Sequence, residues 1–277
     1  MTELSPIFKK EDLIKFKENG FVLVENFLNE KELNKATKIV KKYCKEKNRR
    51  ENLFSINLKT LFYKILKLKL NRFFDDIEIK KIANQKQMEN FSEQYFNNKT
   101  RLSMIDGYIS KKNINADITP WHTDRAYVDK YGTKDIKVYN HHDHYNIKFF
   151  IYLTDVEKQN GCLSYIPKSN LIGYLIRKGI YSGNLNYSPY WSLDQFRKFT
   201  SVKKNYNYIK SNLKDKNVID DFLKKTENLK DNVISDYDYS AKRGDVIIFD
   251  EGGIHRGASA TKNDRIVLRY FYENNYN

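Results

Sequence analysis

The chain has 277 residues, of which 40% are hydrophobic, and it contains 17 phenylalanines and 21 tyrosines. This length and apolar content allow one large domain with a sizeable core and exclude a mostly disordered chain. The formal net charge is +15, but the lysines are spread along the whole chain and form no concentrated basic arm. We therefore expect no nucleic-acid partner.

The cysteine count and the absence of apolar runs indicate the cellular setting. Cys44 and Cys162 are too few for a disulfide framework and form no CxxC pair, which fits a reducing compartment. No run approaches the ~20 apolar residues of a membrane helix, and residues 1–6 lack a basic and then apolar leader pattern. These features predict a cytoplasmic protein with no membrane partner, and they say nothing of its oligomeric state.

The first part of the chain reads as helix, strand, helix. Residues 9–18 have apolar positions at helical spacing, and Gly20 supplies a stop before the apolar run 21–24. Asn29 is a suitable N-cap for a second helix, whose apolar stripe follows over residues 33–43.

Residues 53–97 continue the helical pattern, and Asn71 and the pair Asp75–Asp76 indicate a break within it. From Leu102 onward the pattern changes to short β-branched and aromatic runs separated by glycine, asparagine, aspartate and proline. Five such runs predict strands at residues 102–110, 147–153, 162–166, 246–249 and 266–272. Short strands without regular intervening helices favour an all-β barrel or jelly roll.

Residues 171–240 interrupt this series of strands. Their glycine, asparagine, serine and tyrosine content predicts a long loop, followed by a helix around residues 218–229. Because so long a connection between strands usually covers a binding site, we predict that this insertion is a substrate lid.

Two segments carry candidate metal ligands. In the sequence Trp121-His122-Thr123-Asp124, the histidine and the aspartate stand two apart, so an extended backbone projects both to one face. The segment from Gly244 to Gly257 is an apolar strand and a loop that carries His255. Two histidines and a carboxylate form a facial triad, which suits Fe(II) because it leaves coordination positions open for a cosubstrate and dioxygen.

An arginine follows the second histidine at the start of an apolar run. Arg265 precedes the run 266–268, and a guanidinium on a strand beside the metal can hold a carboxylate through two parallel hydrogen bonds. This is the contact that the distal carboxylate of 2-oxoglutarate requires.

Taken together, these segments resemble the phytanoyl-CoA dioxygenase (PhyH-like) family of Fe(II)- and 2-oxoglutarate-dependent oxygenases. The similarity covers most of the chain and lies in the ordered motifs FKENGFVLVENFLNEKEL, WHTD, NGCLSYIPKSN, GDVIIFDEGGIHRG and DRIVLRYFY. It implies a mainly β fold with flanking helices, in which a double-stranded β-helix (jelly roll, cupin-like) follows an N-terminal helical region. The resemblance predicts one domain over residues 1–277, with a helical part at 1–100 and the β-helix at 101–277.

The resemblance also implies roles for individual residues. It assigns metal binding and catalysis to His122, Asp124 and His255, and cosubstrate anchoring to Arg265. Met104 and Phe150 match positions where the family often has a tryptophan that lines the cosubstrate pocket. The implied cofactors are Fe(II), 2-oxoglutarate as cosubstrate, and O2.

Two departures from the family pattern leave alternatives open. The interval from His255 to Arg265 is one residue shorter than is common, so Arg269 remains an alternative anchor. A serine that many relatives place two residues after the distal histidine is replaced here by Gly257.

Other polar residues have competing interpretations. The cluster His141-His142-Asp143-His144 is a second metal candidate, but we favour a solvated turn because no partner follows downstream. Arg125 and Arg256 follow triad members directly, and contact with substrate and pairing with acids are equally good interpretations.

The predicted function is hydroxylation of a small organic metabolite by an Fe(II)- and 2-oxoglutarate-dependent dioxygenase. An anionic substrate is modestly preferred, because Arg177 and Lys178 add positive charge to the insertion. The alternative is a non-catalytic metal- or ligand-binding β-barrel relative. A nucleic-acid oxygenase is a further alternative, for which the sequence shows no base-flipping lid.

Overall fold

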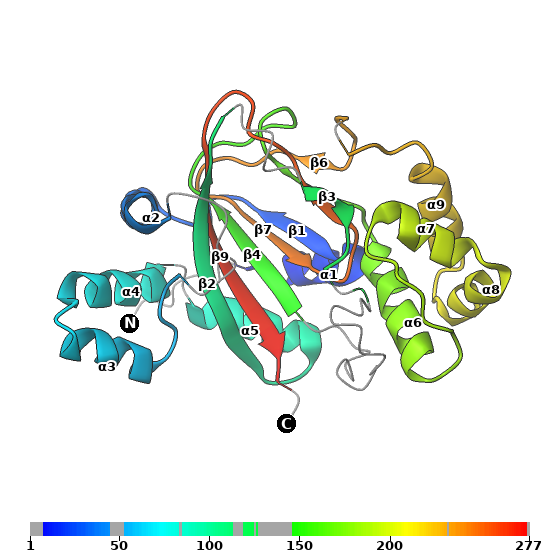
Figure 1. Ribbon diagram of the computed structural model, residues 1–277, viewed down its shortest axis with the longest axis horizontal. Helices are drawn as coiled ribbons and strands as arrows, with labels where there is room; N and C mark the ends of the chain where they lie inside the picture. The colour runs from blue at the N-terminus through cyan, green and yellow to red at the C-terminus, as the bar shows by residue number, and fades with distance from the viewer. Residues whose placement is uncertain are drawn as a thin grey trace.

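The computed structural model describes residues 8–44, 53–82, 85–112, 119–124, 126, 146–231 and 233–275. Within these residues, a central pair of β-sheets is flanked by helices at both ends (Figure 1). The helices are α1 (Lys10–Asn19), α2 (Glu30–Tyr43), α3 (Leu58–Leu66), α4 (Leu70–Ile82), α5 (Gln85–Phe96), α6 (Ser169–Tyr181), α7 (Leu193–Ser201), α8 (Lys203–Asn212) and α9 (Asn217–Lys225).

The first elements form where the sequence predicts them. Helix α1 ends at Gly20, which adopts a left-handed φ of 79° that favours glycine, and β1 (Phe21–Val24) follows directly. Asn29 caps α2, and its side chain accepts from the backbone N–H of Glu32 while the Glu32 carboxylate accepts from the backbone N–H of Asn29. The predicted helix, strand, helix order is therefore confirmed.

The predicted break in the next helical stretch is in a different place. Asn71 and Asp75–Asp76 lie inside α4, and the chain turns instead at residues 67–69. There Leu68 has a φ of 55°, a left-handed conformation that leucine rarely adopts. The sequence contains no glycine or asparagine at this turn to indicate it.

The strands alternate between two antiparallel sheets. One sheet has the order β1-β7-β4-β9-β2 and the other β3-β8-β5-β6. Their bounds are β2 (Thr100–Ser110), β3 (Thr119–His122), β4 (Asn146–Tyr152), β5 (Leu163–Tyr165), β6 (Asp238–Tyr239), β7 (Val246–Asp250), β8 (His255–Gly257) and β9 (Arg265–Asn274). From β2 to β9, successive strands switch sheets except at the β5–β6 pair, which is the connectivity of a jelly roll. This confirms the predicted fold class.

Three apolar clusters hold these layers together. Helices α1, α2, α4 and α5 pack on the outer face of the five-stranded sheet, with Phe16, Val40 and Phe91 among the fully buried contacts. Aromatic and aliphatic side chains between the two sheets form a second cluster. Cys44 and Cys162 are both free, as the sequence predicts, and are buried in these clusters.

The segment 171–240 is mostly helical, and the prediction of a long loop is wrong. Helices α6 to α9 share their own apolar core, which also contains Trp121 from β3. The glycines that suggest a loop serve close packing within α6. A Cβ at Gly173 would lie 2.5 Å from the backbone oxygen of Gly252, and one at Gly179 would lie 2.7 Å from the Leu185 side chain.

None of the helices in the described part of the chain combines the length and the apolar character that a bilayer-spanning segment requires.

Candidate metal and cosubstrate site

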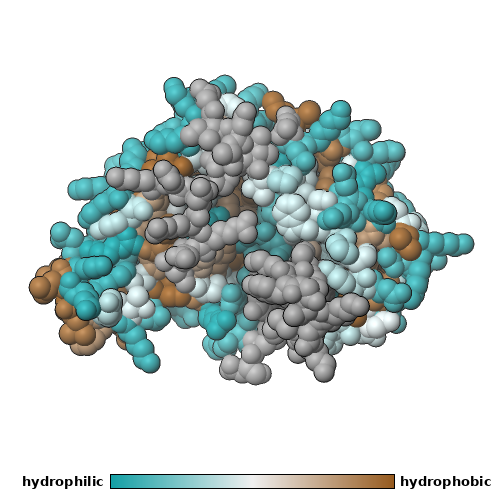
Figure 2. All heavy atoms as spheres, viewed as in Figure 1, coloured by the Kyte–Doolittle hydropathy of each residue, from teal (hydrophilic) through white to brown (hydrophobic). Residues whose placement is uncertain are grey.

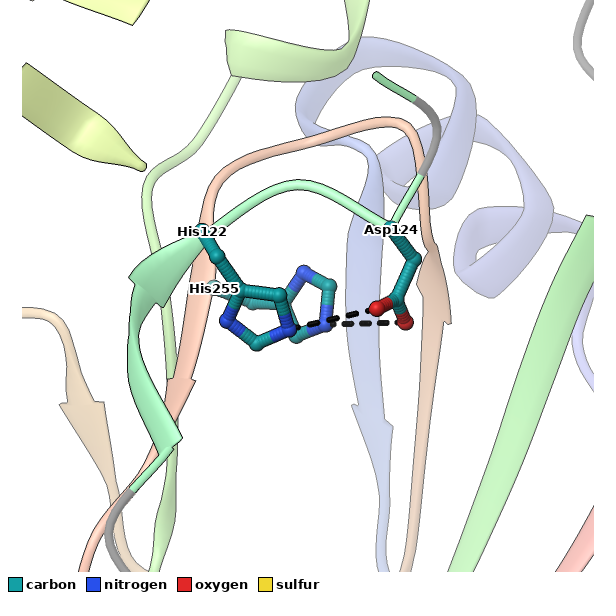
Figure 3. A group of neighbouring side chains, drawn as sticks. All are labelled: His122, Asp124 and His255. Carbon is teal, nitrogen blue, oxygen red and sulfur yellow. Dashed lines mark ion pairs between the residues drawn. The ribbon is translucent and has the colours of Figure 1, made fainter. Parts of the chain in front are cut away.

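Two neighbouring strands bring the predicted metal ligands together. His122 ends β3 and His255 begins β8, and the two residues are direct partners in the antiparallel pairing of these strands. Asp124 follows two residues after His122, in the loop beyond β3. Figure 3 shows the three side chains converging from these two segments.

The three side chains form a compact donor group. Each offers one ligand atom, and these atoms all lie within 4.8 Å of one another. The His122 Nε2 is 3.2 Å from the Asp124 Oδ1, and the His255 Nε2 is 3.4 Å from the Asp124 Oδ2 (Figure 3). In the described residues this is the one cluster of three or more such groups.

The backbone orients both imidazoles in the same way. The Nδ1 of His122 is 2.7 Å from the carbonyl oxygen of Pro120, and the Nδ1 of His255 is 3.0 Å from that of Gly253. Because a carbonyl oxygen only accepts, each contact places the ring proton on Nδ1 and leaves the Nε2 lone pair facing Asp124.

The surroundings favour the charge states that a metal needs. Burial, followed by the neighbouring His122, lowers the pKa of His255, so this imidazole is neutral at neutral pH. Burial acts to raise the pKa of Asp124, but Lys148 and the two histidines outweigh it and hold that pKa well below its usual range. Two imidazoles and a carboxylate are a donor set that fits Fe(II).

Packing behind His255 fixes the loop that carries it. The ring of Tyr165 lies parallel to the His255 imidazole at 6.5 Å, and its hydroxyl donates to the backbone oxygen of Asp250. Gly253 faces this hydroxyl so closely that a Cβ there would lie 2.0 Å from it. The GG step before His255 is therefore a steric requirement of the site.

Arg265 is buried with neutral partners. It donates to the Ser110 Oγ at 3.0 Å and to the backbone oxygens of Ala258 and Gly161. Its Nε has no hydrogen-bond partner, and no carboxylate lies within ion-pair distance among the described residues. A buried guanidinium without a counter-charge is costly, so this group is suited to bind the carboxylate of a ligand.

Arg269 is already neutralised. Its guanidinium donates through Nε and a terminal nitrogen to both carboxylate oxygens of Asp106, which is buried. It also lies over the rings of Tyr108, Phe150 and Phe271. Of the two candidate anchors, Arg265 therefore keeps its charge for a ligand and Arg269 does not.

The predicted site residues share one cavity of about 580 Å³ between the two sheets. Residues that line it include the three donor residues, Arg265, Arg269, Met104 and Phe150. The structure therefore brings every predicted site residue to the same space.

The polar residues of this cavity that sequence reasoning missed include Asn146, Lys148 and Glu251. Lys148 is buried in β4, where its ammonium pairs with Asp124 and lies 3.1 Å from the Glu251 carboxylate. Asn146 begins the same strand, is buried, and has no partner for its Oδ1 among the described residues. A lysine inside the otherwise apolar run Ile147–Tyr152 is the signal that could have found this group.

The remaining candidates lie elsewhere. Arg256 is buried beneath Trp121 and pairs with Asp238 at 2.6 Å, so it does not face the cavity. Arg125 and the cluster His141–His144 lie outside the described residues.

A jelly roll that holds a His-Asp-His group and a buried arginine in one cavity defines a class, the Fe(II)- and 2-oxoglutarate-dependent oxygenases. The model of the phytanoyl-CoA dioxygenase (PhyH) family matches residues 16–267. The chain belongs to this family. It is an Fe(II)- and 2-oxoglutarate-dependent dioxygenase, with iron as cofactor and 2-oxoglutarate and O2 as cosubstrates.

Solved structures show the same fold at low sequence identity. HygX from Streptomyces hygroscopicus, with iron bound, is 15% identical, with a TM-score of 0.54 over 98% of this chain and 88% of its own. AviO1 from Streptomyces viridochromogenes Tue57 is 11% identical, with a TM-score of 0.53 over 98% and 97%. The epimerase SnoN, in complex with Fe3+, alpha ketoglutarate and nogalamycin RO, is 12% identical, with a TM-score of 0.52 over 96% and 83%. No curated protein sequence matches the chain.

Proposed function

We propose that this enzyme hydroxylates a small organic molecule, with His122, Asp124 and His255 as the iron ligands and Arg265 as the anchor of 2-oxoglutarate. The observation that carries the proposal is the shared cavity, which contains three convergent donor atoms and a buried guanidinium without a counter-charge. When bound, Fe(II) supplies the dioxygen chemistry of the class, in which 2-oxoglutarate is oxidised to succinate and carbon dioxide.

The protein's own residues position the reactants. The carbonyl oxygens of Pro120 and Gly253 hold the two imidazoles with Nε2 toward the metal position. Arg265 binds the distal carboxylate of 2-oxoglutarate, and Phe150 and Met104 form part of the cavity wall.

The charge balance of the cavity favours an uncharged, hydrogen-bonding substrate over the anionic one that the sequence predicts. Arg177 is buried beside Gly252, and neither it nor Lys178 is among the residues that line the cavity. Lys148 and Arg269, which do line it, are paired with carboxylates. Once Arg265 has bound 2-oxoglutarate, no unpaired positive charge remains for a substrate among the described lining residues.

We also propose that the helical segment 171–240 limits access to the site, as the lid interpretation predicts. Support comes from Trp191, whose ring lies 5.1 Å from that of His122 and whose backbone oxygen accepts from the N–H of Thr123. Trp191 lies between α6 and α7, so the segment reaches the metal ligands directly. Among known relatives of this fold, HygX has been captured with hygromycin B, and SnoN with nogalamycin RO.

Two measurements test the proposal in sequence. Addition of Fe(II) and 2-oxoglutarate without oxygen should produce the visible charge-transfer band of the class, and oxygen should then yield succinate and carbon dioxide. A non-catalytic β-barrel gives neither signal. The His122→Ala variant serves as the negative control for both.

Mass spectrometry on candidate polar metabolites then identifies the reaction. Hydroxylation consumes one 2-oxoglutarate and one O2, and it adds one oxygen atom to the substrate. An epimerisation leaves the substrate mass unchanged, and a ring closure removes two hydrogens. Turnover in which no product gains oxygen would therefore overturn hydroxylation while leaving the enzyme class intact.

A further inference from the structure

A helical hairpin projects from the end of the molecule opposite to α7–α9 (Figure 1). It consists of α3, α4 and the turn between them, residues 58–82, and we refer to it as the α3–α4 hairpin. Its inner side is fixed to the body. Asp75 accepts hydrogen bonds from the Lys42 ammonium at 2.8 Å and the Tyr43 hydroxyl at 2.7 Å, both of α2, and the Arg72 guanidinium lies 3.8 Å from the ring centroid of Tyr43. The outer side is thus presented on a rigid support.

Large apolar side chains gather on this outer side. Seven of the thirteen exposed large hydrophobics in the described residues belong to the hairpin: Leu58, Phe62, Tyr63, Leu66, Leu68, Leu70 and Phe74. Leu68 and Leu58 are 84% and 82% exposed. Exposed apolar side chains that lie together as a group, unlike single scattered ones, indicate an interaction surface. Figure 2 shows brown spheres gathered at the left end of the molecule, where α3 and α4 lie in Figure 1. Between the two helices lies an apolar groove of about 720 Å³.

The turn holds its most exposed leucine at a conformational cost. Leu68 adopts the left-handed φ of 55°, where a β-carbon is strained and glycine or asparagine is the usual residue. Its side chain makes no buried contact in return, since it is the most exposed large hydrophobic of the hairpin. Strain of this kind is kept where a function requires the side chain.

The charge around the apolar side chains has one sign. Residues 58–82 contain seven lysines and arginines and three carboxylates. All three carboxylates, Asp75, Asp76 and Glu78, are paired with lysine or arginine side chains. The exposed Lys59, Lys67, Lys69 and Lys81 have no carboxylate partner among the described residues.

We propose that the α3–α4 hairpin docks the enzyme on the surface of an anionic lipid bilayer. In the turn, exposed leucines and lysines alternate from Leu66 to Leu70, so apolar and charged groups stand side by side. A protein interface separates an apolar centre from a charged rim, whereas lipid headgroups and acyl chains accept both within one short depth. Lysines reach the headgroups there while their stems stay with the leucines.

This surface is distinct from the catalytic cavity, and the inference does not depend on the substrate. The sequence prediction of no membrane partner rests on the absence of a spanning segment, and docking by a surface hairpin does not need one. The attraction has two parts, apolar insertion and lysine pairing with anionic headgroups, and both are testable.

Vesicle co-sedimentation of the full chain provides the test. The probes are phosphatidylcholine vesicles and vesicles in which about a third of the lipid is phosphatidylglycerol. We expect binding to the anionic vesicles to exceed binding to the neutral ones by at least about tenfold, and to weaken in high salt.

Two sets of variants locate the contact. The triple variant Leu58→Ser, Leu66→Ser, Leu68→Gly removes apolar groups while relieving the strain at residue 68, and Lys59→Glu, Lys67→Glu, Lys69→Glu reverses the charge. Each should lose at least about tenfold in vesicle affinity while its charge-transfer band and succinate production without vesicles stay unchanged.

Matched controls use exposed residues of the segment 171–240. Val202→Ser, Val233→Ser, Ile234→Ser removes aliphatic groups that are about half exposed, and Lys203→Glu, Lys204→Glu, Lys214→Glu makes the same change in net charge as the hairpin lysine variant. Both controls should retain vesicle binding.

Three results would overturn the proposal. The first is no binding to anionic vesicles by the unaltered chain. The second is equal loss of binding in the hairpin and control lysine variants, which would show attraction by net charge alone. The third is a concentration-dependent dimer in sedimentation velocity that the hairpin leucine variant abolishes while vesicle binding is unchanged, which would make the hairpin a contact between copies.

Discussion

The basic residues that line the cavity fall into two groups, Arg265 and the pair Lys148 and Arg269, which we refer to as the Arg265 end and the Lys148 end. At the start of β9, Arg265 is surrounded by backbone oxygens and a hydroxyl, all of them neutral. Lys148 and Arg269 are each bound to carboxylates, and the metal ligand Asp124 is one of these. The positive charge of the Arg265 end therefore has no counter-charge among the described residues, whereas the charges of the Lys148 end are balanced by carboxylates.

This difference explains how one cavity can take two different small molecules. A buried guanidinium with neutral neighbours selects a carboxylate, because only a negatively charged partner compensates the free energy of removing the guanidinium from water. A balanced end attracts no net charge and discriminates by shape and by hydrogen bonds, for which Asn146 offers a carbonyl oxygen. We therefore expect cosubstrate at the Arg265 end and substrate at the Lys148 end.

The largest expected effect comes from removing the proposed metal ligands, which line the same cavity. His122→Ala, Asp124→Ala and His255→Ala should each abolish iron binding and turnover, because each deletes one of three proposed protein ligands. The loss of iron affinity and activity should exceed the roughly 10–100-fold loss that follows removal of a group that only supports a metal ligand. Iron content per chain and succinate production measure it.

Circular dichroism should show the fold intact in each of these variants. Asp264→Ala, which removes an exposed carboxylate paired with Lys111, is the matched control and should keep full iron content. Normal iron occupancy and activity in any one ligand variant would remove that residue from the proposed set.

The two arginines should separate into different phenotypes. Arg265→Ala should raise the 2-oxoglutarate concentration needed for half-maximal rate by about 10–100-fold with iron retained, since a charge-assisted hydrogen bond contributes about 1.5–3 kcal/mol. Arg269→Ala should instead leave the buried Asp106 without a partner and reduce the free energy of unfolding by about 3–5 kcal/mol. Steady-state kinetics and urea unfolding measure the two effects.

Arg265→Lys is the conservative control, and it should recover part of the cosubstrate affinity by restoring the charge without the planar fork. If Arg269→Ala shows the cosubstrate defect and Arg265→Ala does not, the assignment of the two ends is reversed.

Lys148→Met should have a smaller effect, and it should strengthen iron binding rather than weaken it. In the metal-free protein the Lys148 ammonium pairs with the Asp124 carboxylate, so its removal eliminates a competitor of the metal for that carboxylate. We expect Fe(II) to bind about tenfold more tightly and the metal-free protein to lose about 1–3 kcal/mol of stability, because Asp124 and Glu251 lose their shared cation. Metal titration monitored by thermal unfolding measures both.

Lys262→Met breaks an exposed ion pair with Glu157 and serves as the control, for which neither quantity should change. Weaker iron binding by Lys148→Met would instead indicate that the lysine supports the ligand set.

The smallest expected effect concerns access to the balanced end. Chymotrypsin should cleave the metal-free protein in the connection between α6 and α7, after Tyr187, because most residues on either side of it are exposed. Iron, 2-oxoglutarate and substrate together should slow this cleavage several-fold, since Trp191 in the same connection contacts His122.

Cleavage near the exposed Phe62, outside the segment, is the internal control and should be indifferent to ligands. A cleavage rate after Tyr187 that no ligand changes would contradict the lid proposal.

The predictable features of this molecule are those encoded by local patterns. The capping of α2 by Asn29, the stop of α1 at Gly20 and the strands β1, β2, β4, β5, β7 and β9 follow from residue spacing and side-chain type. Strands β3, β6 and β8 have two to four residues and contain no β-branched or aromatic run from which a strand is predicted. Of these, β3 and β8 carry the histidines, which were identified from their chemistry.

The features missed depend on contacts distant in sequence. The glycines of α6 resemble loop residues until the backbone of Gly252 is seen against Gly173. The neutral partners of Arg265 and the carboxylate partner of Arg269 come from other strands, so the choice between the two arginines needed the three-dimensional structure. The same is true of Lys148, whose importance appears only when β4 lies beside Asp124.

The strand order has a consequence for how the enzyme is made. Among the strands of the described residues, β9 is synthesised after the others, yet it lies between β4 and β2 and pairs with both along most of its length. Until it is synthesised, β2 and β4 are open edges able to pair with other chains. Arg265, which opens this strand, arrives at the same moment. Nascent chains therefore complete the sheet and the cosubstrate end of the cavity in one late step. Overexpression should increase the demand for chaperones that bind such open edges.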